Sequence, residues 1–205
     1  MIEYLNSIDT QLFLYLNGLH NSFFDFVMFW LSDKYIWIPL YLYIIYLIIK
    51  RHKIKGLYLI LFTIFVVVLT DQISSHLIKI IVQRLRPSHE PSIAGMVHLS
   101  KEGSGGLYGF VSSHSANAFG IVMFLALVLK SEFRILKYVL FIWAFFVSYS
   151  RIYNGVHYPG DVLCGIILGL FLGWIMYKFY KRLGKKHEKL NLSDSNKSKY
   201  KYSKK

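Results

Sequence analysis

Long apolar segments constrain this chain more than any other feature of its sequence. Five of them are separated by more polar connections: residues 36–49, 57–69 with an extension toward Val82, 116–129, 135–149 and 162–177. About 20 helical residues are needed to cross roughly 30 Å of hydrocarbon, and these segments approach that length. With 55% hydrophobic residues and a mean hydropathy of +0.41, the 205-residue chain is too apolar for a water-soluble domain of its size. The sequence therefore predicts an all-α, polytopic bundle of transmembrane helices.

The two ends of the chain leave some of this organisation open. Residues 23–31 are few and include Asp25, so they form either a sixth, tilted span or a segment in the membrane interface, giving five to six spans. In residues 1–20, apolar positions recur every three or four residues, which predicts an amphipathic helix on the membrane surface or a first helix packed on the bundle. We predict a membrane-embedded domain over residues 1–182. Residues 183–205, rich in Lys, Ser and Asn, are predicted to form a flexible, basic tail.

The net charge of +13 is distributed in a way that predicts an orientation. Of the 24 Lys and Arg residues, 18 lie in residues 50–55, 130–137 and 178–205, which share one side of the membrane if the five clear spans alternate. Positive charge collects on the cytoplasmic side, so the tail is expected inside, and the segments that follow Val82 and Tyr149 are expected outside. A basic tail at the inner surface favours contact with anionic membrane lipids, and this distribution does not favour nucleic acid as a partner.

A first polar array lies at one of the predicted outer ends. Lys79 and Arg86 are seven residues apart on what the pattern predicts to be one long helix, so they would share nearly the same face. The planar guanidinium of arginine matches the oxygens of a phosphate group, and Pro87 is expected to end the helix. The alternative for this pair alone is two cations that reach toward water at the membrane boundary.

A second array, Ser112-Ser113-His114, directly precedes the apolar run that begins at Ala116. Serine at a helix start satisfies free backbone N–H groups, and a helix N-terminus itself binds anions. The imidazole of His114 can transfer a proton near neutral pH. Taken alone, the array is better explained as a capped helix with an incidental histidine.

The third array, Ser150-Arg151-x5-His157-x3-Asp161, is the most specific. Arg151 is expected to end one membrane helix, and Asp161 falls in the first turn of the next, after a proline suited to a helix start. A carboxylate beside an imidazole orients the ring and stabilises positive charge on it, which is what a nucleophilic histidine requires. A structural contact between His157 and Asp161 is the alternative, but the gathering of cations and a second histidine favours a site of phosphoryl transfer.

Together the three arrays resemble the signature of the type 2 phosphatidic acid phosphatase family. This family includes integral-membrane lipid phosphatases, glucose-6-phosphatase and the vanadium haloperoxidases. The resemblance spans residues 79–161, and the first and third parts match in full. In the second part, Val111 and Ser113 occupy positions where the family usually has Pro and Gly.

The resemblance implies a role for each matching residue. His157 would be the nucleophile that forms a phosphohistidine, supported by Asp161, and His114 would protonate the leaving oxygen and later activate water. The phosphoryl oxygens would be bound by five groups: Lys79, Arg86, Ser112, Arg151 and the backbone N–H of Ser113. No metal and no other cofactor is implied, and His76, His89 and His98 do not form a convincing set of metal ligands.

The activity implied is metal-independent hydrolysis of a phosphomonoester or diphosphate on a membrane lipid, at the outer face of the cytoplasmic (inner) membrane. Undecaprenyl diphosphate, phosphatidylglycerol phosphate, phosphatidic acid and a lipid A phosphate all remain open as substrates. Two alternatives are a phosphotransferase that uses the same histidine and a non-catalytic lipid-phosphate binding protein. The loop of residues 88–111 is expected to act as a mobile cover over the site.

Overall fold

The computed structural model describes residues 1–101 and 103–202, with side chains described for residues 1, 3–101 and 103–184. Within them the chain forms helices and connecting loops, with no β-strand. The main helices are α1 (Ile2–Gly18), α2 (Ser22–Ser32), α3 (Ile38–His52), α4 (Ile54–Asp71), α5 (Lys79–Val82), α6 (Ser113–Val128), α7 (Arg134–Tyr153) and α8 (Pro159–Tyr202). The predicted all-α architecture is therefore confirmed.

Three helical segments are long and apolar enough to cross a membrane. They are Ile54–Val82, in which a π-helical stretch (Gln72–Ile78) joins α4 to α5, Ser131–Tyr153 and Pro159–Gly184. Ser22–Ser32 and Ser113–Val128 are apolar but shorter. The chain is therefore an integral membrane protein, while the count of five to six spans stays a prediction.

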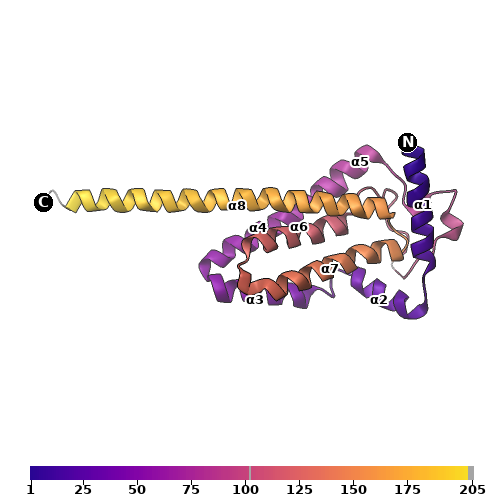
Figure 1. Ribbon diagram of the computed structural model, residues 1–205, viewed down its shortest axis with the longest axis horizontal. Coiled ribbons are helices and arrows are strands. Elements are labelled where there is room, and N and C mark those ends of the chain that lie inside the picture. Colours follow the sequence, from indigo (N-terminus) through magenta and orange to yellow (C-terminus); the bar gives the residue numbers. More distant parts are fainter. Residues whose placement is uncertain (102, 203–205) are drawn as a thin grey trace.

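Helix α6 lies in the centre of the bundle and packs against α8 almost backbone to backbone (Figure 1). A Cβ atom added to Gly165 of α8 would lie 2.5 Å from the carbonyl oxygen of Ser112, and one added to Gly173 would lie 2.5 Å from that of Gly120. Small residues allow membrane helices to approach this closely. The spacing between α6 and α8 is therefore determined by positions that have no side chain.

Helix α1 crosses one end of the bundle rather than running along it (Figure 1). Its Phe13 is fully buried and packs with Ile152 and Tyr158, and Asn17 is also buried. Leu5 and Leu12 on the same helix remain exposed. This arrangement agrees with the second alternative for residues 1–20, a first helix packed on the bundle. Contact of this helix with the membrane surface stays a prediction.

Helix α8 extends well beyond the other helices and continues to Tyr202 (Figure 1). The flexible tail predicted for residues 183–205 is therefore not confirmed: the described backbone continues as helix through most of it, and residues 203–205 lie outside the described part.

Candidate active site

The three polar arrays lie at the same end of the bundle, next to α1 (Figure 1). The first begins with Lys79 at the start of α5 and continues into the loop after it, the second begins α6, and the third extends from the end of α7 through the turn into α8. Five of the eight predicted site residues line one cavity of about 650 Å³: Lys79, Arg86, Ser113, His114 and His157. The other three, Ser112, Arg151 and Asp161, are buried and are not among the residues that line it.

The first array reaches the cavity by a route that differs from the predicted one. Helix α5 ends at Val82, and Gln83 adopts a left-handed conformation with φ of 50°. Arg86 is extended, and its N–H donates to the carbonyl of Leu107 at 3.0 Å. The prediction that Lys79 and Arg86 share a helical face is therefore wrong, because the left-handed residue ends the helix and a residue before proline prefers an extended backbone. Both cations line the cavity nonetheless.

The second array begins α6 as predicted. Ser112 is the N-cap, and its side chain accepts hydrogen bonds from the backbone N–H and the hydroxyl of Ser115, at 3.5 and 3.0 Å. Ser113 Oγ lies 2.8 Å from Ser75 Oγ of the π-helical stretch. The N-terminus of α6 is therefore held in place at the cavity wall, with His114 in its first turn.

The third array places an imidazole beside a fully buried carboxylate. His157 is 1% exposed, and its Nδ1 lies 3.5 Å from Asp161 Oδ2, which also accepts the N–H of Tyr158 at 3.0 Å. The ring therefore faces the carboxylate with one nitrogen and has Nε2 directed away from it. The distance from Nδ1 to Oδ2 is too long for a strong hydrogen bond, as is common for catalytic contacts before a substrate binds.

Burial and the surrounding positive charges keep the ring of His157 neutral. Burial lowers the pKa of His157 well below its usual range, and the positive charges of Arg86, Arg151 and Lys79 lower it further. A neutral imidazole retains a lone pair, which is the form that attacks phosphorus. Arg151 lies 3% exposed at the end of α7, where its guanidinium donates to Ser32 Oγ of α2.

The cavity has one polar end and one apolar end. Away from the cations and histidines it continues between α3, α4, α6 and α7, where its walls are apolar side chains that include Tyr41, Ile44, Ile64, Ile121, Leu125 and Trp143. Asp71 of α4 and Ser75 of the π-helical stretch, which precede Lys79 on the same long helix, also line the cavity. The shape suits a molecule with an anionic group and a hydrocarbon part.

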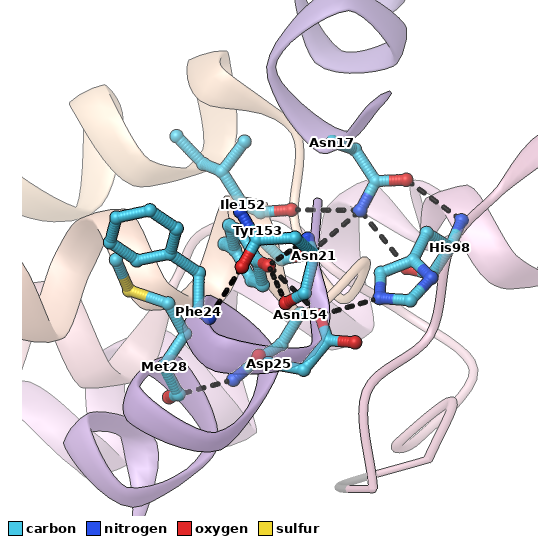
Figure 2. Close-up of polar contacts among 9 residues, drawn as sticks. All are labelled: Asn17, Asn21, Phe24, Asp25, Met28, His98, Ile152, Tyr153 and Asn154. Carbon is cyan, nitrogen blue, oxygen red and sulfur yellow. Dashed lines mark hydrogen bonds and ion pairs between the residues drawn. The ribbon is translucent and has the colours of Figure 1, made fainter. Parts of the chain in front are cut away.

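The loop that follows Pro87 is fastened at its midpoint (Figure 2). The amide of Asn17 accepts the N–H of His98 at 2.8 Å and donates to the carbonyls of His98 and Tyr153 at 3.0 and 2.8 Å. The imidazole of His98 lies 2.8 Å from Asp25 Oδ1, which also accepts the hydroxyl of Tyr153 at 2.9 Å. These contacts join α1, α2 and α7 to the loop, so its middle is not free to swing as the predicted mobile cover would.

Two charged residues in contact with the array residues were not predicted from the sequence. Arg84 donates to Asp161 Oδ1 and to Asp9 Oδ2, each at 2.8 Å. Their positions in the sequence could have indicated them: Arg84 lies inside the first array, and Asp9 lies on the amphipathic helix predicted for residues 1–20. Among the described residues, no group of three or more His, Cys, Asp or Glu is arranged to hold a metal ion.

Comparisons with known proteins agree with the predicted family. Residues 56–185 match the PAP2 superfamily. The chain is 40% identical over 180 residues to a lipid A 4'-phosphatase of Bacteroides thetaiotaomicron, covering 86% of this chain and 79% of that protein. A lipid A 4'-phosphatase of Porphyromonas gingivalis is 32% identical over 182 residues, covering 87% of this chain and 75% of that protein.

A solved structure is similar as well. The crystal structure of Aquifex aeolicus LpxE superposes with a TM-score of 0.56 and 28% identity, covering 82% of this chain and 93% of that one. The match to the family extends over well more than half of the chain, and it includes all three polar arrays. The chain therefore belongs to the PAP2 superfamily and is an enzyme, a lipid phosphatase.

Proposed function

We propose that the protein removes a phosphate group from a membrane lipid through a phosphohistidine at His157. The observation that carries this proposal is the cavity in which His157, His114, Lys79 and Arg86 meet at the polar end of an apolar passage. The polar end fits a phosphate and the apolar passage fits a hydrocarbon chain. A purely structural cluster of these residues would not need such a cavity.

In the first step, Nε2 of His157 attacks phosphorus while the bond from phosphorus to the lipid oxygen breaks. His114, in its imidazolium form, donates a proton to that oxygen, which leaves as an alcohol or, from a diphosphate, as a lipid monophosphate. Asp161 faces Nδ1 and stabilises the positive charge that the attacking ring acquires. In the second step, water transfers a proton to His114 and attacks phosphorus, which releases phosphate and restores His157.

The positive groups act on the oxygens of the transferred phosphoryl group. Lys79 and Arg86 reach it from the cavity wall, and the N-terminus of α6 offers backbone N–H groups, including that of Ser113. Arg151 and Ser112 complete the proposed phosphate-binding set. Fixed donors and cations aimed at these oxygens account for most of the catalysis in phosphoryl transfer.

The relatives suggest which lipid to test first. Two of them are lipid A 4'-phosphatases, so we place a lipid A phosphate first among the substrates, ahead of undecaprenyl diphosphate, phosphatidylglycerol phosphate and phosphatidic acid. The test is phosphate release from each of these lipids by the purified protein. Release from lipid A phosphate at the highest kcat/KM is expected. Binding of all four lipids without any release would instead support a non-catalytic lipid-binding protein, and transfer to an alcohol without release would support a phosphotransferase.

Removal of divalent metal is expected to leave the activity unchanged. The cations around the cavity already neutralise the phosphate charge, which is the contribution a metal would otherwise make. Phosphate release should therefore continue in excess EDTA at the rate measured without it. Loss of activity on chelation, with recovery after addition of one divalent ion, would refute this model of the site.

We place the site at the outer face of the cytoplasmic membrane, with the C-terminal segment inside. In a Cys164→Ala background, cysteine at Ser104 should react with a membrane-impermeant thiol reagent in intact cells, whereas cysteine at Ser195 should react only after permeabilisation. The distribution of positive charge is the reason for this expectation. The reverse labelling pattern would invert the orientation and refute access to a lipid of the outer leaflet.

A further inference from the structure

Arg84 forms ion pairs with two carboxylates that lie far apart in the sequence. Its Nη1 donates to Asp161 Oδ1 and its Nη2 donates to Asp9 Oδ2, both at 2.8 Å. The guanidinium also lies over the ring of Tyr158, with its carbon 4.1 Å from the ring centroid. Three contacts therefore hold this side chain beside the turn that carries His157, although Arg84 itself does not line the cavity.

Asp9 connects α1 to the same turn. Its Oδ1 accepts the N–H of Gly160 at 2.7 Å, in the first turn of α8, while its Oδ2 accepts Arg84. A Cβ atom at position 160 would lie 2.7 Å from Asp9 Oδ2, so only glycine allows this approach. The carboxylate of Asp9 therefore has both oxygens engaged and holds Arg84 in one position.

The environment of Asp161 explains why a cation is needed there. Its side chain has no exposed surface, and an ionised carboxylate removed from water is strongly unfavourable unless it is paired. Oδ1 is paired with Arg84, while Oδ2 accepts the N–H of Tyr158 and faces His157. Burial acts to lower the pKa of Arg84, but the carboxylates of Asp161 and Asp9 raise it above its usual range, so the pairing cation stays charged.

We propose that Arg84 is a positioning residue for the reaction: held by Asp9 of α1, it keeps Asp161 ionised and turned so that Oδ2 faces His157. This proposal rests on the function proposed above for His157 and Asp161. It makes α1 part of the active site through a chain of contacts that runs from Asp9 through Arg84 and Asp161 to His157. Arg84 acts only through Asp161 and does not bind the phosphate.

The change Arg84→Gln is expected to lower kcat by about 10²-fold, within the range for residues that orient a reacting group through another residue. KM should change little, because the cations that bind phosphate are untouched. Asp161 should also gain a proton at higher pH, because it would lose the opposite charge at hydrogen-bond distance that favours its ionised form. The acidic limb of kcat/KM should therefore move to higher pH.

Other titratable groups lie around this carboxylate and stay in place in the variant. They are His157 in the turn, Lys79 on α5 and Asp9 on α1. Because the variant leaves them unchanged, the shift of the acidic limb reports the loss of the Arg84 cation.

Two further variants and one control complete the design. Arg84→Lys keeps the charge and should recover most of the lost kcat and return the acidic limb toward its original pH. Asp9→Asn should lower kcat by about 10-fold, at the lower end of the range for such residues, because Arg84 remains but is held less firmly. The matched control is Arg51→Gln at the end of α3, where the exposed arginine pairs with Glu132, and it should leave kcat, KM and the pH profile unchanged.

Two results would overturn the proposal. The first is a wild-type kcat with an unmoved acidic limb in Arg84→Gln. The second is a lowered kcat in Arg84→Gln with an unmoved acidic limb and a lowered unfolding temperature, without recovery in Arg84→Lys. This second result would show that Arg84 has a purely structural role. If Arg84→Gln does not fold, the proposal is tested with Arg84→Lys and Asp9→Asn. An unchanged kcat and an unmoved acidic limb in Asp9→Asn would then contradict the proposal. Failure of the proposed function is a separate result: full turnover in His157→Ala, or a wild-type protein that releases phosphate from no lipid.

Discussion

The variant His157→Ala is expected to lose phosphate release almost completely, by on the order of 10⁴–10⁶-fold, the range seen when a nucleophile or its catalytic partner is removed. The phosphoryl group would then have no nitrogen to accept it at the polar end of the cavity. The protein should still fold, because alanine leaves the α7–α8 turn and its backbone hydrogen bonds to Arg151 in place. The measurement is phosphate release from lipid A phosphate, together with the unfolding temperature.

His114→Ala separates the two histidines. With an ordinary lipid ester the variant should be slowed by about 10²–10⁴-fold, because an alkoxide leaving group needs a proton. p-Nitrophenyl phosphate has a good leaving group and needs that proton much less. A first-turnover burst of p-nitrophenol should therefore be partly restored in His114→Ala but not in His157→Ala, provided that the small ester binds in the cavity. Equal loss of the burst in both variants would show that the roles are misassigned, and a normal burst in His157→Ala would refute a phosphohistidine.

Gly165→Val is expected to have a second large effect, on folding and on activity together. A Cβ atom at this position would lie 2.5 Å from the carbonyl oxygen of Ser112 and 3.2 Å from Ser115 Cβ, so α6 and α8 must move apart. Overpacking of this kind typically costs about 1–3 kcal/mol. The N-terminus of α6, which carries His114, would shift relative to the turn that carries His157, and a displacement of about 1 Å can cost 10²-fold in rate.

The same helix provides the control for this variant. Gly184→Val places the same side chain where, among the described residues, no atom outside the adjacent helix backbone lies within 4 Å, so unfolding temperature and kcat should match those of the wild type. The measurements are thermal unfolding in detergent and phosphate release at saturating substrate. If Gly165→Val unfolded at the wild-type temperature and kept its kcat, the close packing of α6 on α8 would have no part in placing the two histidines.

Features that depend on neighbouring residues were predicted well from the sequence. Apolar runs gave the all-α membrane architecture, Ser112 was correctly predicted at the start of α6, and the third array was correctly placed between two helices. In each case the physical cause lies within a few residues: hydrophobic length, capping of backbone N–H groups, or a proline at a helix start. The family followed from the spacing within the three arrays, which the comparisons confirm.

Features that depend on distant parts of the chain were not predicted. The helix that carries Lys79 ends at Val82, where the left-handed Gln83 leads into a segment that pairs with residues 107–109, more than 20 positions away. Likewise, the partner of Arg84 on α1, Asp9, is 75 residues away in the sequence. Helical periodicity carries no information about such contacts. The roles of the eight site residues stay predictions, although the structure brings these residues to one end of the bundle.

The polar end and the apolar end of the cavity together affect the direction of the reaction. A lipid phosphate split at the polar end yields inorganic phosphate, which is stable only in water, and a dephosphorylated lipid, whose chains are stable only in hydrocarbon. The products would therefore leave into different phases, phosphate into water from the polar end and the lipid along the passage between α3, α4, α6 and α7. Once they have parted, the local concentration of either product around the other is very low. Partition between two solvents thus makes hydrolysis effectively one-way, without any moving part in the protein.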